Sequence, residues 1–116
     1  MNIKVMEDFI IFKKENSFTK NPDIIQLPDE RLLGVFCLTD QHWAQKYSQI
    51  TLIESKDLGQ NWSLKSIIDK SEPVKGEERW VTPRISLLSD NRLVVICDQD
   101  DYTHCHETQE SGIYAW

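Results

Sequence analysis

Four residues with complementary hydrogen-bonding and packing properties stand at fixed offsets in the segment SKDLGQNW: Ser55, Asp57, Gly59 and Trp62. The Asp57 carboxylate can accept hydrogen bonds from backbone N–H groups of a turn. Gly59 can adopt a positive φ angle, and the Trp62 ring can cover the turn with apolar surface. The apolar run ITLI precedes the segment and SLKSII follows it. The pattern therefore predicts a turn between two β-strands, and it predicts no reaction there.

Two polar loops carry side chains that could bind a ligand. The segment HCHE, His104 to Glu107, contains imidazole, thiol and carboxylate groups, which are metal ligands. Adjacent residues of a strand point in opposite directions, and no second ligand pair stands at a recognisable spacing, so a polar loop beside a cleft is favoured over a metal site. In the other loop, His42 and Trp43 could stack on a sugar, or the indole could cover its own loop. No metal or cofactor is expected.

The chain contains an internal repeat. PDIIQLPDERLLGVFCLTD (22–40) aligns without gaps with PRISLLSDNRLVVICDQDD (83–101), at an offset of 61 residues and with seven identities. Each copy has the pattern of a β-hairpin, in which a short strand, a polar turn (PDER or SDNR) and a more continuously apolar strand follow one another. Cys37 and Cys97 fall in the apolar strands, where we expect small buried side chains.

Each copy continues towards a four-stranded antiparallel meander. In the first copy, a polar loop leads to a third strand at 50–54, the Ser55–Trp62 turn and a fourth strand at 63–68. The second copy reaches GIYAW, in which Ile113 matches Ile50. A meander places the short turns at one end of the sheet and the long loops (38–48 and 98–111) at the other. A ligand site is expected among the long loops.

Four-stranded repeats of this length are typical of β-propeller blades, so the expected fold class is all-β. We expect a first blade at about 20–70, an incomplete second blade at about 80–116, and an outer strand or lead-in at 1–19. One blade buries its faces only against its neighbours, so the remaining blades would be needed for stability. A self-contained β-sandwich of 116 residues is the alternative.

The spacing of Ser55, Asp57, Gly59 and Trp62 resembles the Asp-box (BNR repeat) of the sialidase, or neuraminidase, family. The resemblance implies a six-bladed sialidase-like propeller, of which this chain is an N-terminal fragment of about two blades with a structural Asp-box. It also implies a glycoside hydrolase that acts on terminal sialic acid or a related glycan, so carbohydrate is the expected partner. A non-catalytic propeller that binds glycan or protein is the alternative.

The resemblance also supplies candidate site residues. Asp40, at the end of the second strand, falls near the position of the family's acid/base, and a raised pKa would suit that role. Lys20 falls where the family has the first of three arginines that hold the substrate carboxylate, but a lysine lacks the bidentate fork. Arg84 could help to bind an anionic sugar, or it could face outwards from its strand. The nucleophilic Tyr, its Glu and further arginines would lie outside this chain, which alone should be inactive.

Composition narrows the choice of partner and location. Thirteen Lys plus Arg against nineteen Asp plus Glu give a net charge of −6, which provides no basic face for nucleic acid. No run approaches the ~18 apolar residues of a membrane span, and no signal peptide is recognised. Three cysteines, an odd number, do not suggest a disulfide framework. A cytoplasmic location is the default expectation, and secretion is the alternative.

Overall fold

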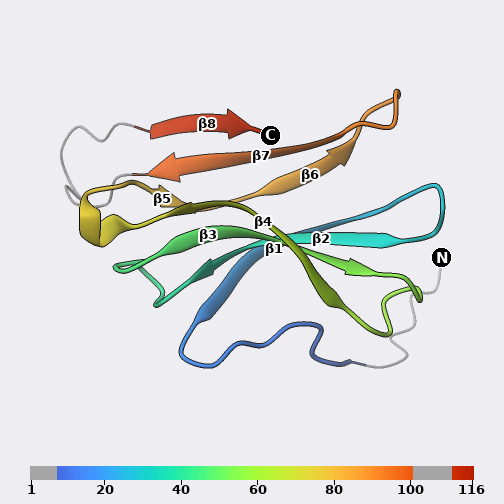
Figure 1. Ribbon diagram of the computed structural model, residues 1–116, viewed down its shortest axis with the longest axis horizontal. Coiled ribbons are helices and arrows are strands. Elements are labelled where there is room, and N and C mark those ends of the chain that lie inside the picture. The colour runs from blue at the N-terminus through green and yellow to red at the C-terminus, as the bar shows by residue number, and fades with distance from the viewer. Residues whose placement is uncertain (1–7, 101–110) are drawn as a thin grey trace, which may run out of the picture.

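The computed structural model describes residues 8–100 and 111–116, and they form two antiparallel β-sheets that lie one above the other (Figure 1). The first sheet contains β1 (Phe18–Gln26), β2 (Leu32–Thr39), β3 (Ser48–Ser55) and β4 (Ser63–Ser71). The second contains β5 (Arg79–Trp80), β6 (Arg84–Leu87), β7 (Leu93–Asp100) and β8 (Ser111–Ala115). A single 3-10 turn, η1 (Pro73–Lys75), connects the sheets, and the described residues contain no α-helix. The predicted all-β class is confirmed.

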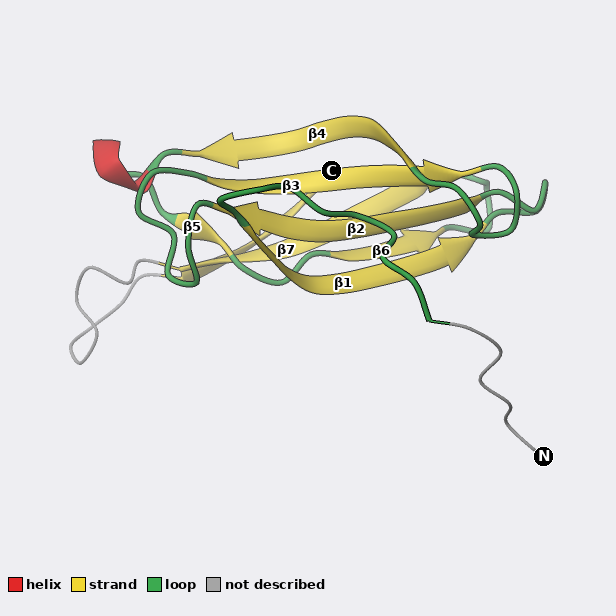
Figure 2. Ribbon diagram, turned by 90° about the horizontal axis from the view of Figure 1, so that it is seen from below, coloured by secondary structure: helices red, strands yellow, loops and turns green. Residues whose placement is uncertain are grey.

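The first sheet is the predicted four-stranded meander, because its strands pair in chain order, β1-β2-β3-β4 (Figure 2). β2 and β3 are the central strands and are buried along almost their whole length. The register between β1 and β2 shifts between Lys20 and Asp23, where Asn21 adopts a φ of 55° and Pro22 has no N–H to donate. Strand β3 begins two residues before, and β4 ends three residues after, the bounds expected from the sequence.

The second sheet repeats the pairing of the first sheet residue for residue. In the first sheet Cys37 pairs with Ile50, and at the equivalent positions of the second sheet Asp98 pairs with Ile113. β5 and β6 both pair with β7, and Val81 to Pro83 separate them at the positions where the register of the continuous strand β1 shifts around Pro22. GIYAW therefore forms the third strand of the second unit, as the repeat predicts.

The two hairpin turns have the same hydrogen bonds. In the first, Leu27 N donates to Arg31 O at 2.8 Å, and in the second, Leu88 N donates to Arg92 O at 2.8 Å. The guanidinium Nε of Arg31 and that of Arg92 each donate to an aspartate two residues earlier at 2.7 Å. The third turn residue has a positive φ in both, at 71° and 64°. The sequence repeat is therefore also a structural repeat.

The two sheets meet through unlike faces. Each sheet has a front face and a back face. The front face of the first sheet is the side that carries Val35 of β2, and the front face of the second is the side that carries the repeat equivalent, Ile96 of β7. The back face is the opposite side of each sheet. A core of buried residues joins the front face of the first sheet to the back face of the second. Its members are Leu33, Val35, Cys37, Ile50 and Leu52 from the first sheet and Trp80, Ile85, Val95 and Cys97 from the second. A smaller cluster of Phe36, Leu38 and Ile53 lies on the back face of the first sheet, under Phe12 and Trp62.

Both described cysteines are buried thiols in the core between the sheets. Burial raises the pKa of Cys37, and it raises the pKa of Cys97 to about 12. These thiols are therefore the small buried side chains that the sequence predicts, and not nucleophiles. Within the part of the chain that the structure describes, no helix is long and apolar enough to cross a membrane.

Candidate functional site

The Ser55–Trp62 turn is a closed hydrogen-bond network. The hydroxyl of Ser55 donates to Asp57 Oδ1 at 2.8 Å and accepts the Gly59 N–H at 2.8 Å. Asp57 also accepts the backbone N–H of Asn61 at 2.8 Å and its side-chain amide at 2.7 Å. The hydrogen bonds from Asn61, and then that from Ser55, lower the pKa of Asp57. The carboxylate is thus held ionised as an acceptor for the turn.

The glycine and the tryptophan of this turn have the predicted roles. Gly59 has a φ of 90°, and a β-carbon there would lie 3.3 Å from a methyl group of Leu32. The Trp62 indole N–H donates to the Gly59 carbonyl at 2.9 Å, and its ring is partly buried over Gly34 of β2. The structure therefore uses all four residues to fold the turn.

The loop between β2 and β3 lies at the opposite end of the sheet and is organised by Asp40. Its Oδ1 accepts the backbone N–H groups of Gln45, Lys46 and Tyr47 at 3.0, 3.1 and 3.4 Å. Burial opposes ionisation, but these hydrogen bonds outweigh it and lower the pKa of Asp40. The expectation of a raised pKa is wrong, because the backbone hydrogen bonds stabilise the charged form.

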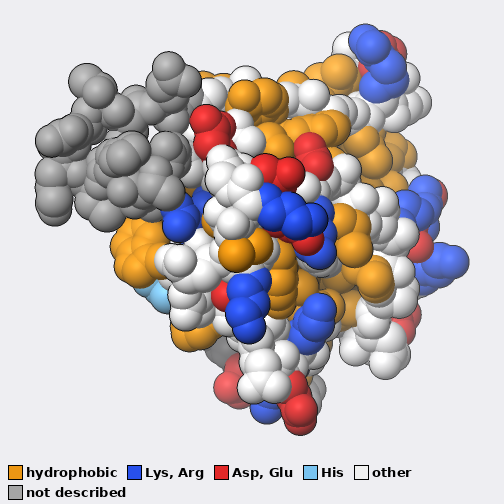
Figure 3. Space-filling view, turned by 60° about the vertical axis from the view of Figure 1, so that its left-hand side comes forward, with side chains coloured by type: hydrophobic (Ala, Val, Ile, Leu, Met, Phe, Trp, Pro, Cys, Tyr) orange, Lys and Arg blue, Asp and Glu red, His pale blue; other side chains and the backbone are white. Residues whose placement is uncertain are grey.

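Lys20 and the aromatic side chains of this loop lie together. Lys20 Nζ donates to the His42 carbonyl at 3.0 Å. The His42 ring lies 4.9 Å from the Trp43 ring and 6.3 Å from the Phe18 ring, measured between centroids. Trp43 is 53% exposed and Phe18 is 49% exposed. In Figure 3 the pale-blue histidine side chain lies beside a hydrophobic patch. A cation and three accessible rings therefore share one end of the first sheet.

The second sheet holds this loop in place through a residue that the sequence analysis missed. Arg79 of β5 is buried, and its Nε donates to the carbonyl of Ala44, which is fully buried within the loop. Nearby, the Ser48 hydroxyl donates to the Trp80 carbonyl at 2.8 Å. A charged residue in a buried two-residue strand has no sequence pattern of its own, because its position depends on packing between the sheets. Phe18, at the first residue of β1, was also missed, because its contact with His42 depends on how the loop at 40–47 folds.

Arg84 is not part of the Lys20 cluster. It is exposed and pairs with Ile96, so it lies on the front face of the second sheet, which faces away from the first. Its Nη1 donates to the adjacent Pro83 carbonyl at 3.1 Å. It borders a shallow depression with Ile96, Asp98 and Ile113, and none of these residues lines the pocket that Lys20 borders. Of the two expectations for Arg84, the structure shows the one in which the side chain faces outwards from its strand.

Metal ligation has no geometric support in the described segments. Within residues 8–100 and 111–116, no three or more His, Cys, Asp or Glu side chains lie close enough together to hold a metal ion. The HCHE segment, His104 to Glu107, lies outside the described residues. Its assignment as a polar loop therefore stays a prediction.

Comparison with protein-family models, with curated proteins and with solved structures finds no match to this chain.

Proposed function

We propose that this chain contributes two adjacent blades to an Asp-box β-propeller, and that the end of the first blade carrying Lys20, His42 and Trp43 binds a glycan. Carbohydrate ligands suit exposed aromatic rings, which stack against the C–H groups of a sugar. A nearby lysine favours an anionic glycan, such as one that ends in sialic acid, because the ammonium pairs with the carboxylate. The Lys20–His42 contact, at 3.0 Å, is the observation that carries this proposal.

The packing of the two sheets supports the propeller part of the proposal. Successive meanders meet front to back, which is how units stack around an axis. A β-sandwich instead packs the inner faces of two sheets against each other and leaves their outer faces to solvent. Here the front face of the second sheet carries exposed apolar side chains beside Arg84 and Asp98, with Ile96 45% exposed and Ile113 81% exposed, although the positions equivalent to these two isoleucines form the core of the first sheet. This repetition favours an array of more than two units.

Binding is favoured over hydrolysis by the state of Asp40. A general acid must hold a proton near the working pH, which needs a raised pKa. Three backbone N–H groups instead stabilise the carboxylate of Asp40 and lower its pKa. An aspartate in that environment is suited to shaping the loop that presents His42 and Trp43.

Substitutions at Trp43 and Lys20 test the binding site. The first tests stacking on the sugar surface, and the second tests pairing with the negative charge of the ligand. Titrate the chain with 3′-sialyllactose and with lactose, which differ in the charged sugar. Trp43→Ala should weaken binding of both, since the ring stacks on sugar surface of either kind. Lys20→Gln should weaken only the charged ligand, and Lys20→Arg should retain it. Leu58→Ala, an exposed residue in the Ser55–Trp62 turn at the far end of the sheet, is the matched control. Equal losses in all four variants would reject the site.

Hydrolysis of sialosides is the second candidate function, because Asp40 and Lys20 both border the loop at 40–47. An acid role for Asp40 predicts that Asp40→Asn depresses turnover of a sialoside with a poor leaving group far more than turnover of an activated aryl sialoside, since only the first needs a proton. The assay requires an assembly that contains all the blades of the propeller. Equal losses on both substrates would reject the acid role.

A further inference from the structure

We propose that copies of this chain associate head to tail, with the front face of the second sheet of one copy docking on the back face of the first sheet of the next. The inference rests on the proposed propeller architecture and adds the partner that completes it, a second copy of the chain. It can be tested apart from glycan binding, because the residues that test it, Ile24 and Ile113, lie outside the loop at 40–47.

The open front face of the second sheet matches the front face that forms the core of the molecule. Val35 and Ile50 are fully buried there. Their equivalents in the second sheet, Ile96 and Ile113, have the same strand pairing but side chains that are 45% and 81% exposed. These two apolar positions have the same strand pairing in both sheets, and among the described residues no second sheet covers Ile96 and Ile113, which lie beside Arg84 and Asp98.

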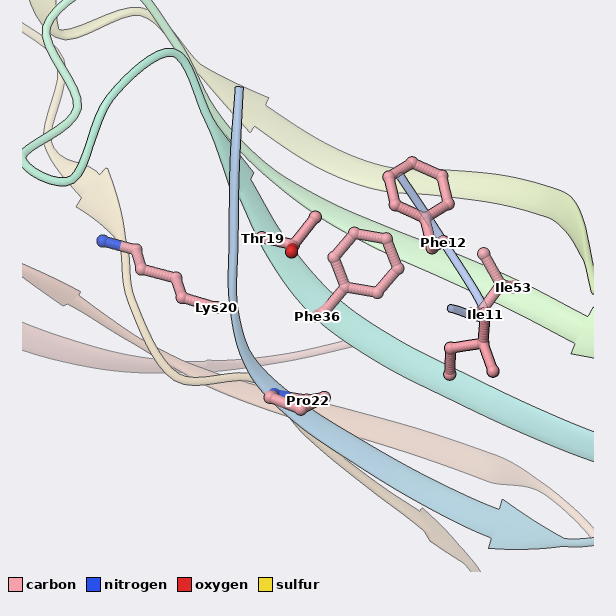
Figure 4. A pocket seen from close by; sticks show the side chains of 7 residues that line it. All are labelled: Ile11, Phe12, Thr19, Lys20, Pro22, Phe36 and Ile53. Atoms are coloured by element: carbon pink, nitrogen blue, oxygen red, sulfur yellow. The ribbon is translucent and has the colours of Figure 1, made fainter. Parts of the chain in front are cut away.

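The back face of the first sheet is the surface on which the front face of the second sheet of another copy would dock. In the second sheet, Ile85 on the back face is 4% exposed because the first sheet covers it, while its repeat equivalent, Ile24, is 53% exposed. A pocket of about 160 Å³ lies on this face (Figure 4). Its apolar lining includes Ile11, Phe36 and Ile53, and the Lys20 side chain extends away from them. The described part of the N-terminal segment, which includes Ile11 and Phe12, thus covers this face only in part.

The contact between the two sheets within one copy shows what kind of surface fits each exposed face. A front face and a back face of this repeat already pack together in the core, so the same two kinds of surface can pack between copies. The contact would be heterologous, and such contacts make a closed ring if the rotation between units closes. Propellers have ~4–8 blades, so rings of about two to four copies with two blades each are expected.

One glutamate on each face tests the geometry. Ile113→Glu changes the front face of the second sheet and Ile24→Glu the back face of the first, and both native side chains are largely exposed, so folding should survive. Sedimentation velocity of the wild-type chain over a concentration series should give one discrete species of about two to four copies. Either substitution should weaken association about tenfold or more. Val74→Glu, at a residue that is 72% exposed in η1 and outside both faces, should have no effect.

Mixing the two variants distinguishes head-to-tail contact from other modes. The Ile113→Glu copy keeps an intact back face and the Ile24→Glu copy an intact front face, so the mixture should form a dimer that neither variant forms alone. A monomeric wild-type chain would overturn the proposal. An open-ended series of masses, or a mixture of variants that does not dimerise, would also overturn it. Association that Ile113→Glu weakens and Ile24→Glu leaves unchanged would overturn it too, because that result indicates that front faces dock on each other.

Discussion

Arg31 Nη1 lies 2.7 Å from Glu54 Oε1, and this contact ties the first hairpin turn to the end of β3, where the Ser55–Trp62 turn begins. Only 8% of the Glu54 side chain is exposed, and Lys65 Nζ lies 3.1 Å from the same oxygen. Arg92, the repeat equivalent of Arg31, pairs with Asp90 alone among the described residues, and its side chain is 75% exposed. The two repeat units therefore contain equivalent arginines in equivalent turns. Arg31 contacts two carboxylates, those of Asp29 and Glu54, whereas Arg92 contacts that of Asp90.

This pair of arginines gives a matched test of the contact. Arg31→Ala should lower the melting temperature more than Arg92→Ala, because only the first leaves Glu54 with a single cationic partner. Both variants also lose an equivalent contact with the aspartate of their own turn, so the loss of that contact cancels when the two melting temperatures are compared. Differential scanning fluorimetry at one protein concentration measures the difference. Equal shifts would show that the Arg31–Glu54 contact contributes nothing to stability.

The same contact predicts a dependence on pH. Lys65 and then Arg31 lower the pKa of Glu54 below its ordinary value of 4.5. A depressed carboxyl pKa stabilises the fold at pH values above the ordinary one, and this stability is lost as the pH falls through the folded-state pKa. The gap in melting temperature between wild type and Arg31→Ala should therefore be constant near neutral pH and shrink below pH 4.5. A gap that widens on acidification would contradict the assignment.

Ser55→Ala tests the network of the Ser55–Trp62 turn. The hydroxyl of Ser55 is the partner of the buried Gly59 N–H, so its loss leaves a buried donor unpaired. We expect a loss of about 1–3 kcal/mol in the free energy of unfolding. Ser63→Ala, at an exposed serine of the adjoining strand, should change it by less than about 0.5 kcal/mol. Urea unfolding of both variants makes the comparison, and similar losses in the two would count against the network.

Asp40 should act as the organiser of its loop. Asp40→Ala removes the acceptor of three backbone N–H groups, so the amide hydrogens of Gln45 and Lys46 should exchange faster with solvent. Asp40→Asn keeps a carbonyl acceptor and should have a smaller effect. The Asn61 amide, bonded to Asp57 at the other end of the sheet, is the internal control. Unchanged exchange at Gln45 and Lys46 would show that the loop holds its shape without Asp40.

The repeat and the turn chemistry could be predicted from the sequence because both are local. The offset between the two hairpins predicted the pairing of β7 with β8 through Ile113, and the spacing from Ser55 to Trp62 predicted a turn closed by its own side chains. Such features depend on residues that are near one another in the chain. The repeat is sufficient to derive the strand pairing, and the hydrogen-bonding properties of turn residues are sufficient to derive the turn.

The environment of the candidate site could not be predicted in the same way. The state of Asp40 depends on how the following residues fold back onto its carboxylate, and two hydrogen-bonding patterns with opposite effects on its pKa fit the same sequence. Arg79 holds the loop through the Ala44 carbonyl, 35 residues away, and that contact exists only because the sheets pack. The face on which Arg84 lies follows from the register of β6 with β7.

Unfolding of residues 1–116 should depend on protein concentration. The apolar front face of the second sheet and the incompletely covered back face of the first leave the single copy poorly stabilised, and association would bury them. The melting temperature should therefore rise across a hundredfold dilution series as the concentration increases. A sharp transition that does not move with concentration would show that the two sheets form a stable domain on their own.

Chemical-shift mapping of a 3′-sialyllactose titration tests the proposed glycan site most directly. The account predicts that the largest changes fall on Phe18, Lys20, His42 and the indole of Trp43, at the end of the first sheet where the Lys20–His42 contact lies. The Ser55–Trp62 turn, at the opposite end, should not respond. Saturable changes centred on that turn, or none anywhere at millimolar ligand, would contradict the proposed function.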